Sequence, residues 1–323
     1  MSRIQREQLD AQLRSAGDGS SGGGGGSANG AGGDGVGGST GAAVQPTVED
    51  LRAGFVQLMS TLPVPGGVRV DARPLGGRPA LHISPESREA ATGTLLYFHG
   101  GSHVVGSPHT ALGLTAELVL RTGIPAYSLD YRLAPEHPFP ADVEDVVAAY
   151  RELLDAAHPP QSIAFAGDSA GGGLSVTGAL AARDAGLPMP AALVAFSPGL
   201  DATREGRSMV TKAAADPLLD RADIDRMSHY YVADADGRDP LLSPAVSGDL
   251  AGLPPMLLQV GTNELLLDDA RRLALRASDA EVDVVLDITA KVPHVFQAFT
   301  DSLDEAGEAL DRAALFLRQR IRG

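Results

Sequence analysis

The segment 164–172, AFAGDSAGG, constrains the fold of this chain more than any other stretch. It contains the pattern G-x-S-x-G, in which a serine, here Ser169, stands on a sharp turn between a β-strand and an α-helix. Residues 163–166 are apolar, as in a central parallel strand, and small residues lead into a helix-like stretch that ends near 185. Because a glycine-rich turn can carry an incidental serine, the pattern alone is weak evidence for a nucleophile.

Apolar runs of strand length alternate with helix-like stretches through the rest of the chain. Strands are expected at 94–98, 124–129, 163–166, 192–196, 256–260 and 282–286, and helices at about 112–120, 142–154, 170–185, 268–277 and 302–320. Residues 68–72 and 80–83 are expected to be paired edge strands. This alternation predicts an α/β fold with a mainly parallel sheet, whose chemistry gathers at the carboxyl ends of the strands.

Composition divides the N-terminal part of the chain. Residues 3–14 are mostly good helix formers, and the Gly-, Ser- and Ala-rich residues that follow to about 45 predict a disordered linker. The first helix is then either docked on the domain or part of a dispensable tail. Order resumes at Thr47, which can cap a helix with apolar positions at Leu51, Phe55 and Leu58.

Charge and composition exclude several classes of protein. A net charge of −15 argues against nucleic acid and anionic membranes as partners. The chain has no Cys, which excludes disulfides, thiolate metal sites and a cysteine nucleophile. Neither a signal-peptide core nor the roughly 20 apolar residues of a membrane span is found. We therefore expect a cytoplasmic protein that is a monomer or a homodimer.

A serine hydroxyl needs a base to take its proton and an acid to orient that base, and in α/β hydrolases these follow in the order Ser, acid, His. Of the eight His in the chain, only His229 and His294 follow Ser169. His294 lies after the last strand, which favours it as the base, whereas His229 is expected on the surface or in a pocket. Glu264, closest to the end of the strand 256–260, is the expected acid. Asp268 is its rival and would otherwise place negative charge in the first turn of a helix.

The reaction also requires N–H donors for the oxyanion of the tetrahedral intermediate. The sequence HGGS at 99–102, directly after a strand, is close to the HGGG-type loop of lipases and esterases. Gly101, Ser102 and Ala170 are therefore the expected donors through their backbone N–H groups. His99 is expected to brace the loop.

The segments HGGS, DYRLAPEHPFPA, GDSAGG, GTNELLLDD and PHVF, in this order, resemble the hormone-sensitive-lipase family of esterases. The resemblance extends from about Thr47 to the C-terminus. It implies an α/β-hydrolase core with a helical cap, serine esterase activity on small to medium acyl esters, and neither a cofactor nor a metal. By this resemblance Ser169, Glu264 and His294 form a catalytic triad.

The resemblance also implies a division of the chain. Residues 1–16 would be a first cap helix, 17–45 a linker, and 46–323 the catalytic domain, with further cap elements at about 46–62 and 200–235. Two features depart from the family pattern: Ser102 stands where a third Gly is usual, and the Gly-rich segment separates the first two cap helices.

Other polar residues have secondary roles in this interpretation. Arg132, Glu136 and His137 are expected to form an internal hydrogen-bonding set in the loop 130–140. Asp168 could assist neighbouring loops, and Tyr230 and Tyr231 are candidate pocket residues. A lactone or amide hydrolase with the same triad is an alternative function. A non-catalytic ligand-binding protein is a further alternative, which the presence of all three triad residues disfavours.

Overall fold

The computed structural model describes residues 2–21, 45–86 and 91–322. The strands are β1 (Val68–Ala72), β2 (Ala80–Pro85), β3 (Thr94–Phe98), β4 (Ala126–Leu129), β5 (Ile163–Asp168), β6 (Ala192–Phe196), β7 (Met256–Gly261) and β8 (Val284–Thr289). The helices are α1 (Ser2–Ser21), α2 (Val48–Met59), α3 (Leu112–Thr122), α4 (Ala141–Asp155), α5 (Ala170–Asp184), α6 (Ser208–Thr211), α7 (Arg221–Val232), α8 (Pro244–Ser247), α9 (Leu267–Asp279) and α10 (Asp304–Arg320), with short 3-10 turns η1 (Pro160–Ser162) and η2 (Phe296–Ala298).

The strands form one sheet of eight in the order β1-β2-β4-β3-β5-β6-β7-β8. The pairs β1–β2 and β2–β4 are antiparallel, and every later pair is parallel. The mainly parallel α/β architecture and the antiparallel pair of edge strands that the sequence predicted are therefore confirmed. Because the strands from β3 to β8 are parallel, their carboxyl ends meet along one edge of the sheet.

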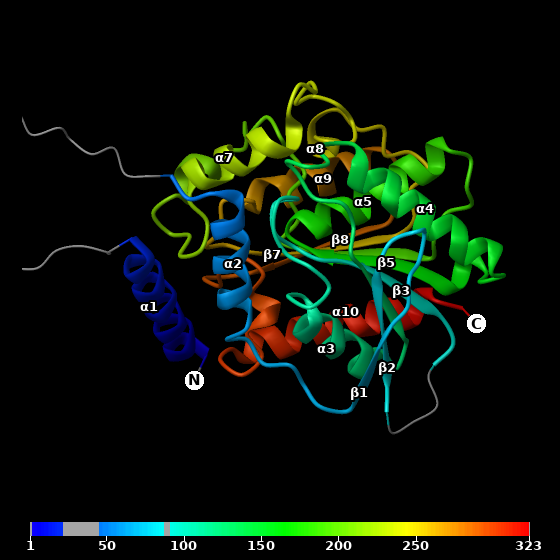
Figure 1. Cartoon of the computed structure of the whole chain (residues 1–323), viewed down its shortest axis with the longest axis horizontal. Helices are drawn as coiled ribbons and strands as arrows, with labels where there is room; N and C mark the ends of the chain where they lie inside the picture. Colours follow the sequence, from blue (N-terminus) through cyan, green and yellow to red (C-terminus); the bar gives the residue numbers. More distant parts are fainter. Residues whose placement is uncertain (1, 22–44, 87–90, 323) are drawn as a thin grey trace, which may run out of the picture.

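Helices cover both faces of this sheet (Figure 1). On one face Leu96 and Phe98 of β3 share an apolar cluster with residues of α4, α5 and α9. On the other face Leu95 and Tyr97 pack in a cluster with residues of α3 and α10. Burial on both sides explains why the central strands are continuous apolar runs instead of alternating ones.

The edge strand β8 differs from the strand expected at 282–286. It begins at Val284 and continues to Thr289, because each of its residues pairs with a residue of β7, from Met256–Val284 to Gly261–Thr289. Asp287 and Thr289 are polar and end the apolar run in the sequence. Pairing with β7 therefore determines the length of β8, and hydropathy does not.

Helix α1 is longer than the stretch of helix formers that predicted it. It ends at Ser21, so residues 17–21, expected to be linker, belong to the helix. The rest of the predicted linker, 22–44, lies outside the described residues. Leu9 of α1 is buried against an apolar cluster that also holds Val292, Phe296, Leu303, Ala306 and Ala309. The Nε atom of Arg6 donates to Glu305 at 2.9 Å. Helix α1 thus docks on α10 and on the segment that carries η2.

Helices α2 and α7 come together far from their places in the sequence. Thr47 caps α2 as expected, in a capping box with Asp50. Val48, Leu51 and Phe55 of α2 share an apolar cluster with Met227, Tyr230 and Tyr231 of α7 and with Val104 and Val105. These two helices therefore cover the loop that follows β3.

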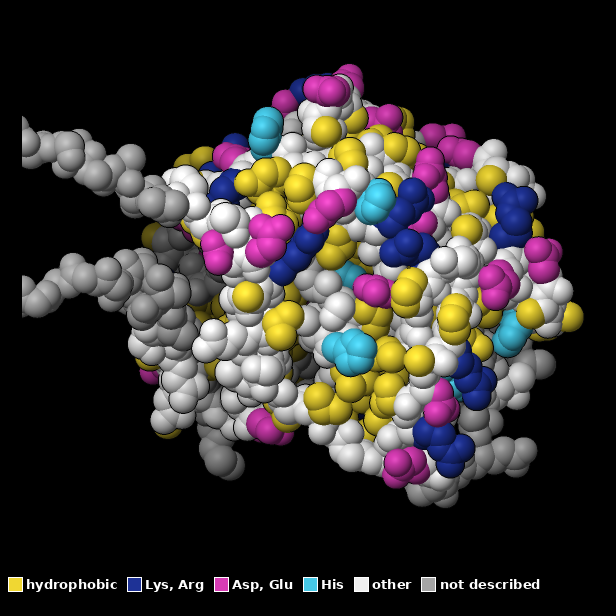
Figure 2. Space-filling model, in the orientation of Figure 1, with side chains coloured by type: hydrophobic (Ala, Val, Ile, Leu, Met, Phe, Trp, Pro, Cys, Tyr) yellow, Lys and Arg dark blue, Asp and Glu magenta, His cyan; other side chains and the backbone are white. Residues whose placement is uncertain are grey.

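Acidic and basic side chains are interspersed on the face shown in Figure 2. The negative net charge is thus not gathered into one patch on that face. Among the helices of the described residues, none is both long enough and apolar enough to cross a membrane.

Candidate active site

Ser169 stands between the last residue of β5 and the first residue of α5, with φ 53° and ψ −119°. A positive φ is uncommon for a residue with a side chain and is a form of backbone strain that recurs at functional sites. A Cβ on Gly167 would lie 2.3 Å from the carbonyl oxygen of Gly171, and one on Gly171 would lie 2.0 Å from that of Phe98. The two glycines therefore allow the tight turn that exposes Ser169.

The structure brings Ser169, His294 and Glu264 into one hydrogen-bonded chain. The Oγ atom of Ser169 lies 2.9 Å from Nε2 of His294, and Nδ1 of His294 lies 2.8 Å from Oε2 of Glu264. Ser169 follows β5, Glu264 follows β7 and His294 follows β8. The three side chains meet because these parallel strands end at the same edge of the sheet.

Glu264 is fully buried and is held from its other oxygen. Its Oε1 atom accepts hydrogen bonds from the hydroxyl of Ser197, at 2.9 Å, and from the N–H of Gly261. The Ser197 hydroxyl in turn accepts the N–H of Val295 at 3.0 Å. Ser197 was not among the residues predicted from the sequence. The signal was present, since Ser197 is the polar residue directly after the apolar strand β6.

The rival acid Asp268 lies elsewhere. Its carboxylate accepts the N–H of Ser208 at 2.9 Å and pairs with Arg271, so it joins α6 to the first turn of α9. His229 is exposed, as expected for a residue outside the site.

Burial lowers the pKa of His294, but the hydrogen bond that its ring donates to Glu264 and the charges of Glu264, Asp216 and Asp168 outweigh burial and raise that pKa above its ordinary value. The imidazolium form of His294 is therefore stabilised by the carboxylate behind it. When the proton of the Ser169 hydroxyl moves to this ring, the carboxylate of Glu264 stabilises the positive charge that the ring gains.

The loop after β3 places backbone N–H groups beside Ser169. Gly101 has φ 122°, and a Cβ there would lie 2.2 Å from the carbonyl oxygen of Val105. Ser102 has φ 53°, so it takes the left-handed conformation that a third glycine would favour. The N–H groups of Gly101, Ser102 and Ala170 donate to no acceptor within the described part of the chain, and Ser102 and Ala170 line a cavity at Ser169. These groups are free to bind an anionic oxygen.

His99 lies beneath this loop in the bracing position that was predicted. Its ring is fully buried, stacks on Tyr131 at 4.2 Å and makes a 2.8 Å hydrogen bond with the carbonyl oxygen of Gly100. Burial lowers the pKa of His99 to about 4, so the ring is neutral at ordinary pH. The hydroxyl of Tyr131 donates to the carbonyl oxygen of His99 at 2.7 Å, which fixes the loop from the other side.

Asp168 supports the same loop. Its buried carboxylate accepts the hydroxyl of Tyr97 at 2.7 Å, and a Cβ on Gly100 would lie 2.3 Å from its Oδ2. Burial raises the pKa of Asp168 to about 6.

A cavity with a volume of about 70 Å³ opens at Ser169. Its walls come from the loop after β3, the turn at Ser169, the segment after β6 and helix α7. They are formed by Ser102, His103, Ser169, Ala170, Gly199, Asp201, Ala202, Arg204, Leu219, Ile224, Ser228, Tyr231, Val232, Leu242 and Leu266. Tyr231 is thus a pocket residue as expected, whereas Tyr230 packs towards α2. In the described ranges no cluster of three or more acidic or His side chains is arranged to hold a metal.

The expectation that Arg132, Glu136 and His137 bond to one another is wrong. Arg132 binds Asp145 of α4, with Nε 2.9 Å from Oδ1. Glu136 binds Arg52 of α2 at 2.7 Å and 2.6 Å, and His137 is exposed. Arg132 ties the loop 130–140 to helix α4, which follows it directly, and Glu136 ties the loop to helix α2, which is distant in the sequence.

Comparison with known proteins places this geometry in a family. Residues 95–298 match the model of a family with the alpha/beta hydrolase fold. An acetyl-hydrolase of Streptomyces hygroscopicus is 48% identical over 225 residues, which cover 70% of this chain and 75% of that protein.

Solved structures agree with these matches. The crystal structure of a hormone-sensitive lipase from a metagenome library is 43% identical and superposes with a TM-score of 0.81, over 84% of this chain and 92% of that one. An esterase crystal soaked with p-nitrophenyl butyrate is 34% identical, with a TM-score of 0.85 over 98% of both chains.

The fold and the site define an α/β hydrolase of the nucleophilic-serine type. The chain belongs to the hormone-sensitive-lipase family of esterases within that fold, as the sequence motifs predicted.

Proposed function

We propose that this protein is a serine carboxylesterase that hydrolyses small to medium acyl esters through an acyl-enzyme. The observation that carries the proposal is the hydrogen-bonded chain from Ser169 through His294 to Glu264, which opens onto a cavity lined by Ser102 and Ala170.

In the proposed reaction Ser169 Oγ attacks the ester carbonyl carbon while His294 Nε2 takes the hydroxyl proton. Glu264 stabilises the imidazolium that forms. The N–H groups of Gly101, Ser102 and Ala170 stabilise the oxyanion. His294 then gives the proton to the leaving alcohol. Water then gives a proton to the same ring and attacks the acyl carbon. The bond from this carbon to Ser169 Oγ breaks, the acid leaves, and His294 returns the proton to Oγ.

The acyl range rests on the relatives and on the cavity. One relative is named an acetyl-hydrolase, and an esterase of the same fold was soaked with a butyrate ester. The cavity walls include Leu219, Ile224 and Leu242, which offer an apolar surface to a short alkyl chain.

We also propose that residues 46–62 and 200–235 form a cap. Support comes from the apolar cluster shared by α2 and α7 and from the residues of α7 that line the cavity. Helix α1 packs on the cluster that contains Val292 and Phe296, on either side of His294. Its role as a cap helix stays a prediction, as do a cytoplasmic location and a monomeric or homodimeric state.

The test is hydrolysis of 4-nitrophenyl esters from acetate to decanoate by the wild-type protein and by Ser169→Ala. We expect kcat/KM to be highest for acyl chains of two to six carbons and to be abolished in Ser169→Ala. Full activity of Ser169→Ala would overturn the mechanism. Activity confined to lactones or amides would favour the alternative hydrolase on the same triad.

A further inference from the structure

A cationic side chain that the mechanism does not use lies in the wall of the active-site cavity. Arg204 lines the cavity together with Ser169 and Ser102. It belongs to the segment between β6 and α6, and its backbone has φ 56°. A positive φ in an arginine is a strained conformation, so the surrounding structure must hold it in place.

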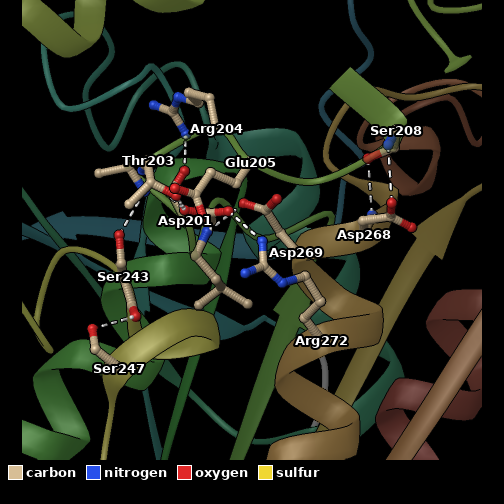
Figure 3. Close-up of polar contacts among 12 residues, drawn as sticks. Asp201, Thr203, Arg204, Glu205, Ser208, Ser243, Ser247, Asp268, Asp269 and Arg272 are labelled. Atoms are coloured by element: carbon tan, nitrogen blue, oxygen red, sulfur yellow. Dashed lines mark hydrogen bonds and ion pairs between the residues drawn. The ribbon is translucent and has the colours of Figure 1, made fainter. Parts of the chain in front are cut away.

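Asp201 organises the segment that carries Arg204 (Figure 3). Its buried Oδ1 atom accepts the N–H of Thr203 at 2.9 Å as well as the Thr203 hydroxyl. Its Oδ2 atom accepts Arg272 of α9, and its carbonyl oxygen accepts Nη1 of Arg204 at 2.9 Å. In Figure 3 the side chain of Arg204 extends away from Asp269 and Arg272. The side chain thus places Nη1 at the backbone carbonyl of Asp201 and not at a carboxylate.

Most of the hydrogen-bonding capacity of this guanidinium is unused. Arginine has five side-chain N–H donors. Among the described residues, the side chain of Arg204 makes one hydrogen bond, from Nη1 to the backbone carbonyl of Asp201. Its Nε atom is buried without a partner. Within the described ranges no carboxylate lies within ion-pair distance, 4.0 Å, of Arg204.

The carboxylates nearest to Arg204 are engaged elsewhere. Asp201 is bound by Thr203 and Arg272. Asp225 is bound by Arg221, with Nε 2.8 Å from Oδ2. These acids and Asp269 therefore act on Arg204 only through longer-range attraction.

Two electrostatic effects leave Arg204 as the cation of this wall. Burial lowers the pKa of Arg204, and the negative charges of Asp269 and Asp201 act in the opposite direction. Because the ordinary pKa of arginine is very high, the guanidinium stays charged. Burial raises the pKa of Asp269 to about 7, so this carboxylate is partly neutral near pH 7. Arg204 as a whole is half-buried, but its Nε atom is buried, and leaving such a cation without an ion pair is costly, so an anion in the cavity would offset that cost.

We propose that Arg204 binds a carboxylate on the substrate, so that the preferred substrates are esters whose acyl or alcohol part carries a negative charge. This inference rests on the proposed function, because the same cavity must hold the ester at Ser169. The ester carbonyl lies at Ser169 and the free N–H groups of the loop. The charged end lies along the cavity towards α7, where Ser228 lines the same wall. A charge-assisted pair with a guanidinium is among the strongest hydrogen bonds available there.

The experiment compares substrates that match in size and differ in charge. On the acyl side the pair is mono(4-nitrophenyl) glutarate and 4-nitrophenyl pentanoate, and on the alcohol side 4-acetoxybenzoate and its methyl ester. Each is assayed with the wild-type protein, Arg204→Gln, Arg204→Lys and Arg207→Gln, and the rate without protein is subtracted. Arg207 is the matched control, since it is exposed and lies three positions along the same segment.

We expect the wild-type protein to prefer the anionic member of at least one pair by about threefold or more in kcat/KM. In Arg204→Gln the ratio of anionic to neutral kcat/KM should fall by about tenfold, mainly through KM, which is the effect of about 1.4 kcal/mol of lost binding. Arg204→Lys should keep part of the preference, and Arg207→Gln should keep all of it.

Equal kcat/KM for both members of both pairs in the wild-type protein would overturn the proposal, even if no Arg204 variant folds. An unchanged ratio in a folded Arg204→Gln protein would also overturn it. Both results leave the proposed function standing as long as Ser169→Ala abolishes hydrolysis. Hydrolysis that persists in Ser169→Ala would instead overturn the proposed function.

Discussion

The Nε2 atom of His294 lies 2.9 Å from the Oγ atom of Ser169, although the two residues are 125 positions apart in the chain. The hydroxyl can act as a nucleophile only while this ring is neutral. The protonation state of His294 therefore links the geometry of the site to the pH at which it works.

As the pH is lowered, activity should begin to fall at a pH above 6.5, which is the ordinary pKa of histidine. The pKa of His294 is raised, because Glu264 and the nearby charges outweigh burial, and the ring is thus protonated at a higher pH than a free histidine. The measurement is kcat/KM against pH for a neutral ester. In Asp168→Asn the acidic limb should move to a lower pH, because the variant lacks one of the charges that raise the pKa of His294. An acidic limb below pH 6 in both proteins would contradict this assignment.

Glu264→Gln should lower kcat by about 10³- to 10⁴-fold, the effect of presenting an amide N–H to Nδ1 and so holding the ring in the wrong tautomer. The variant retains an oxygen to accept Ser197 and Gly261, which favours a folded protein. Asp268→Asn is the matched change, because Asp268 contacts Ser208 and Arg271 but not His294. Its kcat should stay within about threefold of wild type. A greater loss in Asp268→Asn than in Glu264→Gln would show that the acid is wrongly assigned.

Gly171→Ala should destabilise the protein by about 3 kcal/mol or more, because the new Cβ would lie 2.0 Å from the carbonyl oxygen of Phe98, which is held in the sheet. Gly54→Ala, at an exposed position of helix α2, provides the contrast. No atom lies within 4 Å of a Cβ there, and alanine should stabilise the helix by about 1 kcal/mol. Denaturant titration of both variants measures the difference. Equal effects in the two would mean that the turn at Ser169 can relax.

The stability of the protein should depend on pH through Asp269. Burial raises the pKa of this carboxyl to about 7 from an ordinary value of 3.8, so the folded state binds a proton that the unfolded state releases. This contribution is fully present below about pH 4 and is lost as the pH rises to 7. Asp269→Asn cannot lose a proton, so relative to wild type it should gain at least about 1 kcal/mol between pH 5 and pH 8. Calorimetry across this range tests it, and parallel stability curves for the two proteins would contradict it.

The turn at Ser169 and the loop at 99–102 could be predicted because each depends on residues that are close together in the sequence. The turn at Ser169 needs glycines at fixed offsets, and the loop at 99–102 needs small residues directly after a strand, so both could be recognised from their letters. The order of Ser169, Glu264 and His294 along the chain led to the same three side chains that the structure joins by hydrogen bonds. This succeeded because parallel strands bring their carboxyl ends to one edge whatever their separation in the sequence.

Contacts between distant segments were decided only by the tertiary structure. The partner of Glu136 is Arg52 on α2, and no pattern near the loop 130–140 indicates it. Helix α1 docks on residues near the far end of the chain through Leu9 and Arg6, which the sequence showed only as an apolar and a charged position.

The same distinction applies to the catalytic turn and the cavity wall. The sequence by itself determined that Ser169 stands on a strand-to-helix turn with its base and acid downstream, since backbone sterics allow few residues there. Only the tertiary structure decided that Ser197 holds Glu264 and that Arg204 lines the cavity. The physical reason is that burial and charge pairing are set by what packs around a side chain, and here the neighbours come from β6, α7 and α9.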